Sequence, residues 1–274
     1  MMRTALLVFL AVAAIAPSYD AEVKEWREHR RASLLKDDGW LTLTGLYWLH
    51  EGSNDIELPT HPPSHVDFVL RDGHVSIDKE VLRDDMDPKG PTVIRNGSVD
   101  YQAIKRVDNG VDKFGIRVKD TQSEARKDFK GLDYFPTNPA YRVEARFELY
   151  NPPHKITITN VLGMTSDETS PGALVFTLQG KTFRLDPIWD MSDPEPRDLF
   201  IIFRDQTSGR ETYAAARYLY AKPPGKDGRT IVDFNKSYNP PCVFTHFATC
   251  PLPPQQNRLP IRVEAGEKKY AGHA

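Results

Sequence analysis

The sequence contains only two cysteines in 274 residues, has no long hydrophobic run and carries no excess of charge of one sign. Its 36 lysines and arginines nearly balance 38 aspartates and glutamates, so it lacks the basic surface that nucleic acids and anionic lipids require. The apolar run over residues 5–16 is shorter than the roughly 20 residues that cross a bilayer. We therefore expect no nucleic-acid partner and no membrane span in the mature chain.

Sequence motifs of several common enzyme classes are also absent. The chain has no G-x-S-x-G nucleophile elbow, no phosphate-binding P-loop, no G-x-G-x-x-G dinucleotide fingerprint and no H-E-x-x-H zinc motif. These absences argue against the hydrolases, nucleotide hydrolases, dinucleotide enzymes and zinc proteases that such motifs identify. We predict no cofactor and no metal ion.

The N-terminal residues have the pattern of a secretory signal peptide. Arg3 precedes the apolar run, and the small side chains of Ala16 and Ser18 suit cleavage before Tyr19. We therefore predict a signal peptide over residues 1–18, a single β-rich domain over residues 19–274, and export to the periplasm or the extracellular space. An uncleaved anchor is the alternative.

The rest of the chain is typical of a mainly β protein. An amphipathic helix is expected over Val23–Lys36, and the sequence then alternates between apolar and polar residues in short runs. Hairpin turns are predicted at Asp72-Gly73, Asn96-Gly97 and Asn109-Gly110. The runs "TYAAARYLYA" and "IRVEA" are interpreted as strands. About a dozen such strands favour an antiparallel barrel or sandwich with an N-terminal amphipathic helix.

Both cysteines lie in the proline-bounded segment "NPPCVFTHFATCPLPP". On a helix Cys242, His246 and Cys250 would share one face and form a zinc-ligand set. However, the valine, threonines and phenylalanines between them are mediocre helix formers. In an exported protein with two cysteines, pairing is the default. We predict a disulfide between Cys242 and Cys250, with a zinc site, a catalytic thiol and unpaired buried thiols as the alternatives.

The same region carries a family resemblance. The run "DFNKSYNPPCVFTHFATCPLPPQQNRLPIRVEAGE", with "GWLTLTGLYWL" and "FRDQTSGRETYAAARYL" upstream, resembles the domain of unknown function 1684 family of uncharacterised bacterial and archaeal proteins. The resemblance spans nearly the whole mature chain. It implies no established activity.

Polar side chains concentrate in the runs "FRDQTSGRETYAAARYLYA", "DFNKSYNPP" and "QNRL". From these runs we predict a ligand site made of Asp205, Thr207, Tyr213, Arg217, Asp233, Asn235, Tyr238, Asn257 and Arg258. Arg217 and Arg258 would donate paired hydrogen bonds to an anion, and Asp205 or Asp233 would act as a base. The structural alternative is that these residues form turns and lock loops over a β core.

Three functions follow from this pattern. The first is binding of a small polar or anionic molecule. The second is a metal-independent hydrolase or lyase that uses Asp205 or Asp233 together with Arg217. The third is a structural envelope protein without a ligand.

Overall fold

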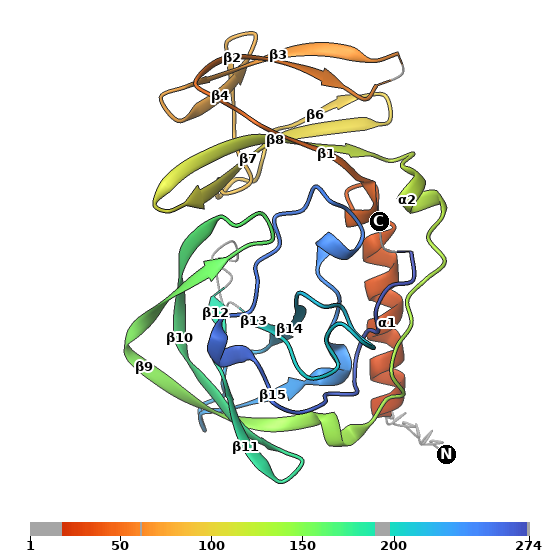
Figure 1. Cartoon of the computed structure of the whole chain (residues 1–274), viewed down its shortest axis with the longest axis vertical. Coiled ribbons are helices and arrows are strands. Elements are labelled where there is room, and N and C mark those ends of the chain that lie inside the picture. The colour runs from red at the N-terminus through yellow and green to blue at the C-terminus, as the bar shows by residue number, and fades with distance from the viewer. Residues whose placement is uncertain (1–17, 61, 190–197, 273–274) are drawn as a thin grey trace, which may run out of the picture.

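The fold of the chain is shown in Figure 1, a computed structural model that describes residues 18–60, 62–189 and 198–272. Except for Ser18, the predicted signal peptide lies outside these residues, so the signal peptide and export stay predictions. Helix α1 (Tyr19–Leu34) starts four residues before the predicted helix, because the Ser18 hydroxyl accepts a hydrogen bond from the Ala21 amide and caps it. None of the helices in the described residues is long and apolar enough to cross a membrane.

The N-terminal half of the fold consists of two antiparallel four-stranded sheets, in the strand orders β1-β8-β7-β6 and β2-β3-β4-β5. Their strands are β1 (Leu43–Trp48), β2 (Gly52–Leu58), β3 (Ser64–Arg71), β4 (His74–Ile77), β5 (Glu80–Leu82), β6 (Val93–Asn96), β7 (Val99–Asp108) and β8 (Val111–Asp120). Apolar side chains from both sheets, among them Phe68 and Ile116, form one core. A short helix α2 (Glu124–Lys127) follows this sandwich.

The C-terminal half is built from a four-stranded sheet, β11-β10-β9-β15, and a three-stranded sheet, β12-β13-β14. The strands are β9 (Arg142–Thr159), β10 (Thr165–Leu178), β11 (Lys181–Leu185), β12 (Ile188–Trp189), β13 (Leu199–Phe203), β14 (Arg217–Ala221) and β15 (Arg229–Asp233). In Figure 1 these strands curve into an open barrel beside α1, below the N-terminal sheets. The barrel encloses the second core, which includes Leu174, Phe203 and Phe234.

Strands β13 and β14 each contribute side chains to two different environments. Residues of one face, such as Ile201 and Leu219, belong to the barrel core. Residues of the other face, including Phe200, Tyr218 and Tyr220, point out of the barrel because successive side chains alternate along a strand. Phe200 and Tyr220 lie directly opposite each other in the β13–β14 pair. This outer face is one wall of the cleft described below.

The structure confirms a mainly β, antiparallel fold with an N-terminal helix. Two hairpin turns also form where predicted, since both residues of Asp72-Gly73 and of Asn109-Gly110 have positive φ angles. The third turn is shifted by one residue. Asn96 pairs with Val99, so Gly97 and Ser98 make that turn.

Two strand predictions are corrected by the structure. In "TYAAARYLYA" the strand begins only at Arg217, after an irregular stretch. The run "IRVEA" is not a strand, because side chains hold its backbone. The carboxylate of Asp205 accepts a hydrogen bond from the Val263 amide, and Arg217 donates to the Val263 and Ala265 carbonyls.

Candidate functional site

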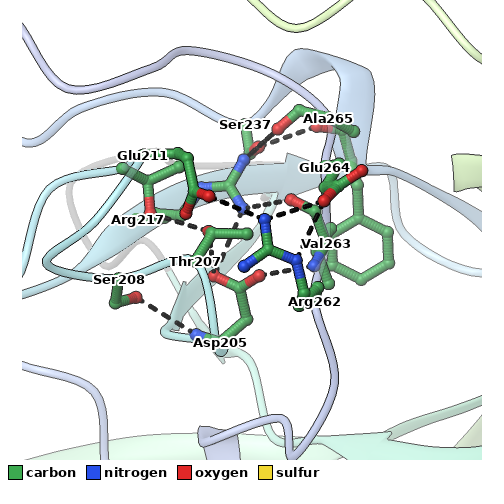
Figure 2. Close-up of polar contacts among 12 residues, drawn as sticks. Asp205, Thr207, Ser208, Glu211, Arg217, Ser237, Arg262, Val263, Glu264 and Ala265 are labelled. Atoms are coloured by element: carbon green, nitrogen blue, oxygen red, sulfur yellow. Dashed lines mark hydrogen bonds and ion pairs between the residues drawn. The ribbon is translucent and has the colours of Figure 1, made fainter.

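Figure 2 shows the part of the predicted polar site that surrounds Arg217. Arg217 is 1% exposed, and its Nη1 lies 3.5 Å from Asp205 Oδ1. Nη1 also donates to the Val263 carbonyl at 3.0 Å, and Nη2 donates to the Ser237 hydroxyl at 2.7 Å and to the Ala265 carbonyl. Only Nε has no partner among the described residues. The guanidinium therefore joins β14 to Ser237 and to the C-terminal segment.

Asp205 belongs to the same hydrogen-bond network. Its side chain has no exposed surface. Oδ1 accepts a hydrogen bond from the Thr207 hydroxyl at 2.8 Å, and Oδ2 accepts one from the Val263 amide at 2.5 Å. A carboxylate held in this way is closed to a ligand and to water, so the contacts favour the structural alternative for Asp205, Thr207 and Arg217.

A second network contains Asp233 and Asn235. Asp233 Oδ1 accepts hydrogen bonds from the Tyr19 hydroxyl at 2.7 Å and from the Asn235 amide at 3.1 Å. Asn235 Nδ2 donates to the Tyr19 oxygen and to the Asn138 carbonyl. Burial and the neighbouring Asp233 raise the pKa of Tyr19. These contacts fasten the start of α1 to the end of β15.

The other predicted residues lie elsewhere. Asn257 is buried, and its amide bonds the backbone of Asp186 and Ile202. Tyr213 is half-buried against apolar side chains, and Arg258 is exposed. The nine residues thus do not line one common cavity. Their predicted ligand role stays a prediction, and of the nine only Tyr238 lines the cleft described below.

The predicted disulfide is not present in the structure. Cys242 and Cys250 are free, buried thiols, and the Cys242 amide donates to Cys250 Sγ at 3.0 Å. Both pack in an apolar cluster, which accepts neutral thiols without a covalent bond. The helical zinc arrangement is absent too: the segment contains a 3₁₀ turn at Pro241–Val243, and His246 is exposed. No group of three metal-ligating side chains occurs among the described residues.

Alkylation should distinguish two thiols from a disulfide. We expect protein unfolded in denaturant without reductant to take up two labels per chain, measured as intact mass. The folded protein should react slowly because both cysteines are buried; burial also raises the pKa of Cys250, whereas the contact with Cys250 lowers the pKa of Cys242. Labels that appear only after reduction would show that the cysteines are paired.

A cleft of about 390 Å³ lies where the N-terminal sandwich meets the outer face of β13 and β14. Its lining combines rings and guanidinium groups, with a floor from residues 248–251 of the cysteine segment. The rings are Trp40, Phe200, Tyr218, Tyr220 and Tyr238, and the cations are Arg30, Arg106 and Arg117. It adjoins a second cavity of about 680 Å³ that shares Arg106 and Arg117 with it.

Two of the three arginines in the cleft are paired. Arg106 donates to both carboxylate oxygens of Asp85, at 3.0 and 2.9 Å, and its Nε donates to the Thr249 hydroxyl at 3.0 Å. Arg30 of α1 contacts Glu267 at 3.0 Å. Its guanidinium also lies over the ring of Tyr238, 4.6 Å from the centroid. Each of these cations therefore has its own buried or half-buried carboxylate.

Arg117 on β8 differs from the other two arginines. The residue is 6% exposed, its Nε has no hydrogen-bond partner among the described residues, and Nη1 lies 3.5 Å from the Asp85 oxygen that Arg106 already binds. The pKa of Arg117 is lowered to about 10, mainly by burial and next by the neighbouring charge of Arg106, against the raising effect of Asp85. The guanidinium is protonated at pH 7, so the cleft contains a buried positive charge that is only partly neutralised.

Sequence reasoning did not single out Arg106, Arg117 or Tyr220 as site residues. In "KFGIRVK" the apolar positions Phe114, Ile116 and Val118 alternate with Arg117, so the pattern places Arg117 on a solvent-facing side. The only sequence feature that pointed to Arg117 was its position inside a long predicted strand. That feature is a weak indication of a site, because exposed arginines are common in strands.

Comparison with protein families identifies the family to which this chain belongs. A family described as "Protein of unknown function (DUF1684)" matches residues 127–268, which is just over half of the 274 residues. The chain belongs to this family. Within the cleft, the DUF1684 match includes Tyr220 and Tyr238, whereas Trp40, Arg106 and Arg117 precede it.

One solved structure is similar to this DUF1684 chain. It is the solution NMR structure of an uncharacterized protein of Haloarcula marismortui, at 35% sequence identity and a TM-score of 0.45. The similarity covers 54% of this chain and 81% of that one. No curated protein matches the chain.

Proposed function

We propose that this protein binds a small organic anion in the cleft between the N-terminal sandwich and strands β13 and β14. The single observation that carries the proposal is the buried guanidinium of Arg117, which lines the cleft with an Nε that has no hydrogen-bond partner among the described residues and with Nη1 3.5 Å from a carboxylate shared with Arg106. A buried charge is costly unless it is paired and hydrogen-bonded. Its presence in an open cavity is accounted for if a ligand supplies the missing acceptor.

The charges around the cleft indicate the sign and size of the ligand charge. Glu267 neutralises Arg30, and Asp85 neutralises Arg106. Arg117 has no carboxylate of its own and only shares Asp85 with Arg106. One carboxylate or phosphate group would complete this set, since both accept the paired hydrogen bonds of a guanidinium. The proposed ligand belongs to the class predicted from the sequence, but its site is this cleft, which contains only Tyr238 of the nine predicted residues.

Calorimetric titration of the purified protein tests the proposal. The probes are acetate, benzoate, inorganic phosphate and phenyl phosphate. We expect at least one probe to bind with a stoichiometry of one, and Arg117→Met to weaken that binding at least tenfold. A hydrogen bond between charged groups contributes about 1.5–3 kcal/mol, and each 1.4 kcal/mol is a factor of about ten.

Arg95→Met is the control for the loss of a positive charge. Arg95 lies on β6 of the same sandwich, does not line either cavity, and forms an exposed ion pair with the nearby Asp100. We expect this variant to bind within about twofold of the unaltered protein, because an exposed charge at a distance is screened by salt. Absence of binding by all four probes, or equal weakening in both variants, would contradict an anion site at Arg117.

A further inference from the structure

The wall of the cleft opposite the sandwich is a row of aromatic rings. Phe200 and Tyr220 stack with centroids 5.0 Å apart and an interplanar angle of 28°. Tyr220 and Tyr238 are nearly parallel, at 13°, with centroids 6.3 Å apart. We call Phe200, Tyr220 and Tyr238 the ring row. The three rings line the same cleft as Arg117.

The exposure of Tyr220 is unusual for a large ring in a cavity. Tyr220 is 42% exposed although it lines both the cleft and the adjoining second cavity and has aromatic neighbours. Its strand neighbours Leu219 and Ala221 are buried in the barrel core, so β14 itself is firmly held. A well-packed strand therefore contributes a partly exposed aromatic ring to the lining of both cavities, where it can contact a ligand ring.

Trp40 brings the aromatic surface next to the charge. The Arg117 guanidinium lies 5.4 Å from the centroid of the Trp40 ring, and Trp40 and Arg117 line the same two cavities as Phe200 and Tyr220. A ligand whose acid group binds Arg117 therefore has aromatic rings within the same cleft. The cleft therefore places one cationic side chain, Arg117, beside several aromatic side chains.

We infer that the ligand of this cleft is an aromatic acid, in which a planar ring carries one carboxylate or phosphate group. The acid group binds Arg117, and the ring stacks on the ring row. This inference rests on the proposed function, because it assumes that Arg117 binds the anion. Aromatic pairs gain a further preference beyond the area that they bury, so an aromatic acid should bind about two- to tenfold more tightly than a saturated acid of the same size.

The test compares 2-naphthoate with decahydro-2-naphthoate, its saturated counterpart, by calorimetric titration of the full protein, with acetate as the acid group alone. We expect 2-naphthoate to bind about two- to tenfold more tightly than decahydro-2-naphthoate. Tyr220→Leu should remove most of that difference, because leucine keeps apolar bulk and loses the ring face. Phe247→Leu is the matched control, since Phe247 is also exposed, at 38%, and lines neither cavity.

The outcomes separate this inference from the proposed function. If both acids bind equally and Arg117→Met weakens both, the anion site stands and the aromatic inference is wrong. If 2-naphthoate is preferred but Tyr220→Leu and Phe247→Leu weaken it to the same extent, the ring row is not where the ring binds. If neither acid binds, or if Arg117→Met leaves binding unchanged, the proposed function fails and the inference fails with it.

Discussion

Replacing Arg217 with methionine is expected to lower the free energy of unfolding by about 3–5 kcal/mol, the usual effect of removing one partner from a buried ion pair. Arg217 is 1% exposed, and its carboxylate partner Asp205 has no exposed surface. The substitution would also leave the Ala265 carbonyl and the Ser237 hydroxyl without their charged donor. Each buried polar group left unpaired adds a further penalty.

Chemical denaturation monitored by tryptophan fluorescence measures this loss. The control is Arg229→Met on the neighbouring strand β15, where an exposed guanidinium pairs with Glu144 at the surface. That variant should change the free energy of unfolding by less than about 1 kcal/mol, since exposed ion pairs contribute little. If Arg217→Met were as stable as the control and instead abolished ligand binding, the ligand role predicted from the sequence for Arg217 would be correct and the structural one wrong.

Replacing Arg117 with methionine is expected to have the opposite effect on stability. We expect the free energy of unfolding to stay unchanged or to rise by as much as about 2 kcal/mol, because a buried and incompletely paired charge is exchanged for an apolar side chain. Asp85 is not left alone, since it keeps both hydrogen bonds from Arg106 and one from the Lys105 amide. A gain in stability combined with weaker anion binding is the signature of a functional charge.

The same denaturation experiment, with Arg95→Met as the control, checks this prediction. A decrease of more than about 1 kcal/mol for Arg117→Met would mean that Arg117 stabilises the fold as Arg217 does. The cleft would then contain no charge in need of a ligand. The two buried arginines are therefore distinguished by the sign of one measurement, which does not depend on knowing the ligand.

Local sequence patterns were sufficient for most of the secondary structure. Alternation predicts the strands, and the Asp72-Gly73 and Asn109-Gly110 turns form as expected because few other residue pairs adopt two positive φ angles in succession. The mainly antiparallel fold follows from the number of such hairpins. The errors occur where the backbone is held by distant side chains, as when Asp205 and Arg217 bind the run predicted to be a strand at residues 261–265.

The cysteines show a different limit. Their number and spacing describe a pair close in sequence, and the structure does place the Cys242 amide against the Cys250 sulfur. Whether two nearby thiols bond depends on the path of the segment and on the apolar side chains around it. Neither the path nor the surroundings can be read from the spacing, and in the structure the predicted disulfide is absent.

What the sequence determined by itself is which side chains share a face of each strand; what only the tertiary structure decided is what covers that face. Arg117 and Arg217 are both arginines inside strands, and alternation alone leaves each free to face solvent. Folding buries Arg217 among acceptors from three segments and leaves Arg117 in a cleft with one shared carboxylate. The difference arises because a strand's two faces are set by adjacent residues, whereas their environments are set by other segments of the chain, which for Arg217 lie 12 to 48 residues away.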